Sequence, residues 1–172
     1  MERMDVYDRE RQKTGRTMDR ADKPAPGDCR LVVHVCVFNA AGELLIQRRS
    51  PEKFAYPLRW DVSAAGAVDA GETSGQAAER EMREELGYAL ELADSRPVMT
   101  VNFPNGFDDF YVVEREIDLE DLTLQKEEVC EAAWVSLEEA ERMVADKRFC
   151  PYPKGLLTML YSLRHGKGFV DE

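Results

Sequence analysis

The segment Leu31–Phe38 constrains the fold of this chain more than any other, because it is apolar on both faces. It is also rich in β-branched residues, and a strand with that pattern is typical of the buried centre of a sheet. The turn Asn39–Glu43 follows it, and Leu44–Arg49 then has the pattern of a returning strand. We therefore expect a hairpin whose first strand lies at the centre of the sheet.

Helices and strands alternate along the rest of the chain. A Thr73 N-cap with Gln76 three residues later predicts a helix that begins there and ends at Gly87. Residues 64–72 are small and flexible, and they are too rich in glycine for a helix. Further strands are expected at 60–63, 97–102, 109–115 and 132–135, and further helices at 136–144 and 154–164. This alternation predicts one α/β domain with a mixed sheet over residues 29–172, preceded by a lead-in arm or hairpin over residues 1–28.

Charge and composition exclude several classes of protein. The 172 residues carry 23 Lys and Arg against 34 Asp and Glu, a net charge of −11, which is unsuited to binding duplex nucleic acid. No stretch approaches the roughly 18 apolar residues that span a bilayer, so no membrane partner is expected. The four cysteines lack zinc-like spacing. With no signal-peptide pattern at the N-terminus, they are read as reduced thiols of a cytoplasmic protein.

The predicted helix after Thr73 carries an acidic face. On a helical wheel Glu81, Glu84 and Glu85 share an arc of about 100°, and Met82 and Leu86 form an adjoining apolar face. Such a helix packs on a sheet with its acidic edge beside a cavity. Glu84 and Glu85 lie in the last turn, where the helix dipole disfavours anions. Oxygen ligands of this kind suit Mg²⁺ or Mn²⁺, and a solvated acidic face is the alternative.

A longer pattern surrounds these carboxylates. Gly66, Glu72 and the run from Arg80 to Tyr88, REMREELGY, match the Nudix box, G-x5-E-x7-R-E-U-x-E-E-x-G-U, at every fixed position. Tyr88 departs only from the aliphatic preference of the final position. The chain therefore resembles the Nudix hydrolase superfamily, over roughly residues 30–145. That resemblance implies an α/β/α sandwich with a mixed sheet.

The same resemblance implies the activity. It is a Mg²⁺-dependent hydrolysis, with Mn²⁺ as a substitute, of a diphosphate linkage by attack of water at phosphorus. The substrate would be a small molecule, either a nucleoside diphosphate derivative or a related organic pyrophosphate. Within the box, the resemblance implies metal ligation by Glu84, Glu85 and the carbonyl of Gly66, a ligand or general-base role for Glu81, and an Arg80–Glu72 pair that orients the carboxylates.

Candidate residues outside the box follow less directly. Many family members add a glutamate shortly before a tryptophan, and Glu128, rather than Glu127, is the preferred candidate here, with a solvated loop acid as the alternative. Arg48 or Arg49 at the end of a strand can clamp a phosphate, or simply face solvent. Phe103 belongs to the loop that we expect at the substrate rim.

Two other functions stay open. The sequence around Leu45–Lys53 resembles the subgroup of isopentenyl-diphosphate isomerases, but Trp60–Ala67 lacks the cysteine and histidine of those enzymes, and Ala65 cannot protonate an alkene. A nucleotide-binding Nudix module without catalysis is the other alternative, although such modules often lose box carboxylates. The C-terminal helix either completes the core or forms a homodimer contact.

Overall fold

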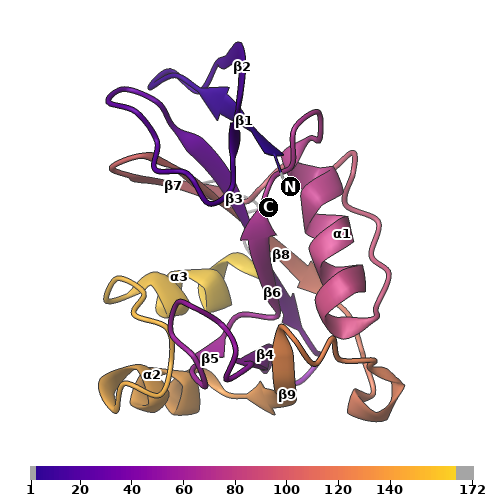
Figure 1. Ribbon diagram of the computed structural model, residues 1–172. Coiled ribbons are helices and arrows are strands. Elements are labelled where there is room, and N and C mark those ends of the chain that lie inside the picture. The colour runs from indigo at the N-terminus through magenta and orange to yellow at the C-terminus, as the bar shows by residue number, and fades with distance from the viewer. Residues whose placement is uncertain (1–2, 166–172) are drawn as a thin grey trace.

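The structure is a computed structural model that describes residues 3–165 (Figure 1). The outer ends of the predicted arm and domain, residues 1–2 and 166–172, lie outside the described residues. In chain order the elements are β1 (Arg3–Tyr7), β2 (Lys13–Asp19), β3 (Arg30–Phe38), β4 (Leu44–Arg49), β5 (Trp60–Asp61), β6 (Ala64–Ala67), α1 (Ser74–Leu86), β7 (Met99–Phe103), β8 (Gly106–Glu114), a 3₁₀ turn (Leu119–Asp121), β9 (Val129–Val135), α2 (Leu137–Ala145) and α3 (Leu156–Leu163).

The apolar strand β3 lies at the centre of the sheet, as its sequence predicts. It pairs in parallel with β8 along its whole length and antiparallel with β6, while β7 extends the sheet beyond β8. On the other side β4 pairs with β5 and β9. The sheet is therefore mixed and has seven strands.

The predicted hairpin of β3 and β4 is present only at its turn. The two strands pair at Phe38 and Leu44 and then separate. Ser63 fills the gap, because its hydroxyl accepts from the N–H of Val37 at 2.9 Å and donates to the carbonyl of Leu45 at 2.7 Å. A buried polar side chain thus replaces the ladder hydrogen bonds that a continuous hairpin would make. The separation leaves one edge of β3 open for β6.

Helices cover both faces of the sheet, which confirms the α/β/α sandwich (Figure 1). On one face, Val33 and Val35 of β3 pack with Met82 and Leu86 of α1. On the other face, a second core joins the sheet to α2 and α3. Its fully buried members include Cys36, Phe38, Phe110, Ala140 and Leu160. Within residues 3–165 no helix is long and apolar enough to cross a membrane.

Residues 64–72 do not form a helix, as their glycine content predicts, but their first part is a strand rather than a flexible segment. Ala64–Ala67 form β6, which pairs with β3 and lies under α1 (Figure 1). Alanine and glycine have low strand propensity, but packing between a sheet and a helix overrides it here. The small side chains let α1 approach the β6 backbone closely.

Helix α1 begins and ends where the sequence predicts. Thr73 accepts from the N–H of Gln76 at 3.2 Å, and the Gln76 side chain accepts from the N–H of Thr73 at 2.9 Å, so the capping box is complete. Gly87 closes the helix in the left-handed conformation at φ 69°. These two caps fix the register of the box carboxylates on the sheet.

The Thr73 cap gives a first prediction. Thr73→Ala removes one side-chain acceptor from the first turn, so the free energy of unfolding should fall by about 1 kcal/mol. Urea denaturation measures this loss. Ser95→Ala, in an exposed loop, is the control and should change stability by less than about 0.5 kcal/mol. An equal loss in both variants would show that the cap does not stabilise α1.

Candidate active site

Glu81 lies on the buried side of α1, with its carboxylate directly against the backbone of β6. Glycine at position 66 makes this possible, because a Cβ there would overlap the Glu81 carboxylate. The Glu81 residue is 6% exposed. The capped helix and the glycine strand together therefore place one carboxylate at the interface of two elements.

Arg80 joins the acidic residues around it into one network. Its guanidinium binds Glu72 in a bidentate pair, at 2.9 and 3.0 Å, and donates to the carbonyl of Ala67 at 2.9 Å. The remaining nitrogen, Nη1, donates to Glu81 at 2.7 Å and to Glu84 at 3.2 Å. A planar fork of five donors can do this, whereas a lysine ammonium cannot. Arg80 thus fixes the Ala67–Glu72 loop relative to α1.

The three box carboxylates differ in their surroundings. Burial raises the pKa of Glu81, although the charges of Arg80 and of the more distant Arg20 lower it. Burial also raises the pKa of Glu85 well above its ordinary value, and the charge of Glu81 raises it further, while the N–H of Ala65 donates at 3.2 Å and lowers it. Glu84 is about half exposed. Two desolvated carboxylates side by side favour a cation between them.

The donor set fits a hard divalent ion in its chemistry, because it consists of carboxylate and backbone oxygens. Across residues 3–165, however, no group of three or more His, Cys, Asp or Glu side chains is arranged to hold a metal ion. Arg80 explains this arrangement, since it engages oxygens of both Glu81 and Glu84. A metal ion here would compete with Arg80 for those oxygens.

Two cavities meet beside the box. The smaller, of about 120 Å³, is lined by Arg20, Asp69, Arg80, Glu81, Glu84, Gln125 and Glu128. The larger, of about 1030 Å³, includes five cationic residues in its lining, Arg20, Lys23, Arg30, Arg49 and Lys53. Arg20 and Glu128 line both. The same lining contains four acids, Asp22, Glu52, Glu127 and Glu128, so the acidic box opens onto a cavity with groups of both signs and one more cation than acids.

Of the two glutamates predicted before the tryptophan, only Glu128 lines the smaller cavity. Its carboxylate forms an ion pair with Lys53, from the loop after β4. Glu127 is exposed and, of the two cavities, lines only the larger one. The structure thus brings Glu128 to the box and holds it against a lysine.

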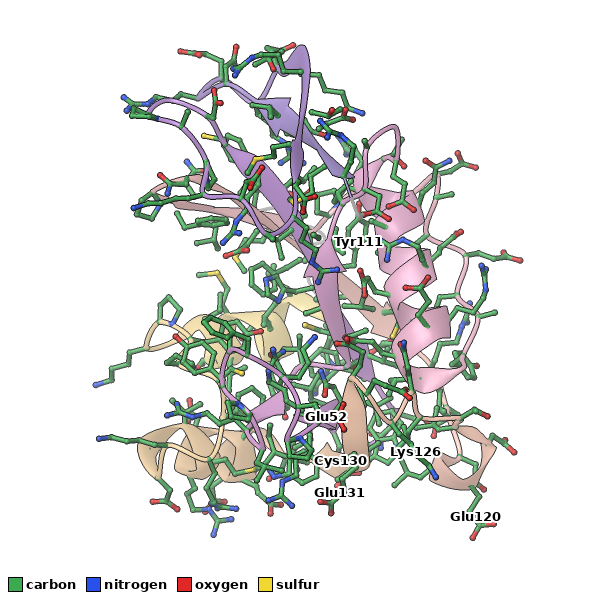
Figure 2. The ribbon with its side chains drawn as sticks, viewed as in Figure 1. Glu52, Tyr111, Glu120, Lys126, Cys130 and Glu131 are labelled. Atoms are coloured by element: carbon green, nitrogen blue, oxygen red, sulfur yellow. The ribbon has the colours of Figure 1, made fainter. Side chains whose placement is uncertain are left out.

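The two candidate arginines of β4 point in different directions, as alternate strand residues do. Arg49 lines the larger cavity, donates to the carbonyl of Ala55 at 3.0 Å and lies 3.5 Å from Asp61. Arg48 instead contacts Leu58 and pairs at 3.2 Å with Glu131, which Figure 2 shows near the lower edge of the molecule. Only Arg49 is placed to meet a ligand in this cavity.

Phe103 does not line either cavity in the described part of the chain. The guanidinium carbon of Arg30 lies over the Phe103 ring, 5.8 Å from the ring centre, and the ring packs against Gly106. Its role in the structure is to support Arg30, which does line the larger cavity. The aromatic residues of β8 are buried, and Figure 2 shows Tyr111 beside the first turn of α1, where its hydroxyl donates to Ser74 at 3.0 Å.

Sequence reasoning missed four residues at the box, Arg20, Lys53, Asp69 and Gln125. Asp69 lies inside the matched motif at a variable position, so its charge next to Glu72 was a usable signal. Arg20, Lys53 and Gln125 reach the site only through tertiary packing, and no spacing in the sequence marks them.

Comparisons with known proteins agree on one family. The model of the NUDIX domain matches residues 29–154. An uncharacterised Nudix hydrolase of Listeria monocytogenes is 46% identical over 165 residues, 96% of each chain. An isopentenyl-diphosphate Delta-isomerase of Halorhodospira halophila is 35% identical over 92 residues, 54% of this chain and 53% of that protein. The crystal structure of a Deinococcus radiodurans protein has a TM-score of 0.75 at 25% identity, covering 94% of this chain and 98% of that one.

Proposed function

The chain belongs to the Nudix hydrolase family and is a pyrophosphohydrolase, and we propose that it cleaves a nucleoside diphosphate derivative or related organic pyrophosphate with Mg²⁺. Mn²⁺ is the expected substitute. The observation that carries this proposal is the gathering of Glu72, Glu81 and Glu84 around Arg80, next to a cavity whose lining includes five cationic residues. The acids suit the metal, and the cations suit the phosphates.

Each box residue has a proposed task. Glu84, Glu85 and the carbonyl of Gly66 would hold Mg²⁺, and Glu128 would join them after leaving Lys53. The bound metal supplies positive charge to the phosphoryl oxygens and lowers the pKa of an attacking water. Arg80, held in place by Glu72, keeps the carboxylates oriented.

Glu81 is the proposed general base, with metal ligation as its other possible role. Its burial raises its pKa toward the range in which a carboxylate accepts a proton efficiently near neutral pH. Its position against Gly66 holds it at the helix–strand interface, so it needs no rearrangement of the backbone to act. It would take the proton from the water that attacks phosphorus.

The substrate side of the site is the larger cavity. Arg49 is the proposed phosphate clamp, because its guanidinium lines this cavity beside Lys53. Arg48 no longer belongs to this proposal, since it pairs with Glu131. All four cysteines are free, which supports a reducing compartment such as the cytoplasm.

Isomerase activity is the second candidate, favoured by the similarity to the Halorhodospira halophila protein. The structure places Ala65 in β6, with its N–H donated to Glu85. The methyl side chain of Ala65 is not an acid, so this position provides no proton donor for the protonation of an alkene.

A panel of diphosphate compounds tests the proposal, incubated with Mg²⁺, Mn²⁺ or EDTA. We expect metal-dependent release of product that EDTA abolishes and that Glu84→Gln reduces by about 10²-fold or more. Glu138→Gln is the matched control, because Glu138 is an exposed acid in the first turn of α2 and should leave turnover unchanged. Tight binding without turnover would favour a binding module, and formation of dimethylallyl diphosphate would establish the isomerase.

A further inference from the structure

The segment after β2 forms a wall of the larger cavity. Five consecutive residues line it, Arg20, Ala21, Asp22, Lys23 and Pro24. The NUDIX domain match begins at residue 29, so this wall comes from a part of the chain outside the family domain. The N-terminal hairpin therefore contributes surface to the site that the family motif does not describe.

The hairpin is fixed to the loop of the box. In β1, the carbonyl of Arg3 accepts a hydrogen bond from the N–H of Ala70 at 2.7 Å, and the side chain of Asp5 accepts from the N–H of Gly71 at 3.0 Å. Met4 and Val6 are buried. A paired bridge between Tyr7 and Cys29, with hydrogen bonds of 2.8 and 2.9 Å, ties β1 to the start of the domain. These contacts hold β1 against the box loop, and β2, which pairs with β1 up to Asp19, leads directly into the wall.

Arg20 occupies the junction of the two cavities. It lines the smaller one with Glu81 and Glu84 and the larger one with Lys23 and Arg49. A substrate whose diphosphate extends from the box toward Arg49 in the larger cavity would lie next to Arg20, which lines both cavities.

We infer that Arg20 binds a non-bridging oxygen of the substrate diphosphate, so that the N-terminal hairpin supplies a substrate-binding residue to the site. The inference rests on the proposed function for the location of the diphosphate. A guanidinium suits this task because its planar donors match phosphate oxygens in pairs. In a chain of net charge −11, a cation at the mouth of an acidic cleft also offsets repulsion of an anionic ligand.

Kinetics and binding of three variants test the inference. Arg20→Met should raise KM, and the Kd for imidodiphosphate with Mg²⁺, by about 10–100-fold, the effect of losing one or two charge-assisted hydrogen bonds, with a smaller change in kcat. Arg20→Lys should restore part of the loss, because it keeps the charge but not the fork. Arg9→Met removes an exposed arginine of the same hairpin that lines neither cavity, and should match the wild type.

The outcomes separate the role of Arg20 from the proposed hydrolase function. A fall in kcat with unchanged KM and Kd would show that Arg20 only positions Glu81, and an unchanged Arg20→Met enzyme would likewise overturn the inference. Thermal melting checks that each variant folds. If the wild type hydrolyses no diphosphate compound, the proposed function fails, while the imidodiphosphate Kd values still decide whether Arg20 binds diphosphate.

Discussion

Glu85→Gln is expected to lower turnover by about 10²–10³-fold and, at the same time, to stabilise the metal-free protein at neutral pH. The loss follows from removing a proposed metal ligand. The gain follows from burial, because the Glu85 residue is 3% exposed and its carboxylate accepts a single 3.2 Å hydrogen bond from the N–H of Ala65 among the described residues. Glutamine fills the same space without a buried charge, so stability should rise on the order of 1 kcal/mol.

The pH dependence gives this prediction its sign. The pKa of Glu85 in the folded protein lies above the ordinary value of 4.5. At a pH between 4.5 and the folded pKa, Glu85 is therefore protonated in the folded protein and ionised in the unfolded chain. The stability of the wild type in EDTA should therefore fall as pH rises through that window and stay lower above it. Glu85→Gln should lose most of this slope, and Glu81, whose pKa is shifted the same way, should supply the remainder.

Urea unfolding in EDTA from pH 5 to 8 measures both effects. Glu84→Gln is the control, because Glu84 is about half exposed and carries little desolvation to relieve. A Glu85→Gln protein less stable than the wild type at pH 8 would mean that the hydrogen bond from Ala65 outweighs the burial of charge.

The features that could be predicted from the sequence are those that depend on residues close together in the chain. The caps of α1 are such a case, since Thr73 and Gln76 satisfy each other within one turn. The separation of β3 from β4 is the opposite case. It depends on Ser63, which comes from a later segment and bonds to both strands. No pattern within residues 31–49 carries that information.

The same distinction applies to the site. The spacing of the box fixes which carboxylates share a helix face, so Glu81, Glu84 and Glu85 could be chosen from the sequence. It does not fix their burial, and the structure makes Glu85 far more buried than Glu84. Arg20 is held by packing of a hairpin against the box loop, which a one-dimensional motif cannot encode.

Gly66→Ala should separate activity from stability. The three atoms nearest to the added Cβ all belong to the end of the Glu81 side chain, which can turn aside, so the protein should fold with little loss of stability. Displacing that carboxylate by about 1 Å should lower kcat by about 10²-fold.

Gly75→Ala is the matched variant, because its Cβ would meet the backbone carbonyl of Leu92, which cannot turn aside. It should lose about 1–3 kcal/mol of stability and keep its activity per folded molecule. Turnover on the best diphosphate compound, corrected for the folded fraction, measures the contrast. If Gly66→Ala instead behaved like Gly75→Ala, the glycine would serve the packing of α1 on β6 rather than the placement of Glu81.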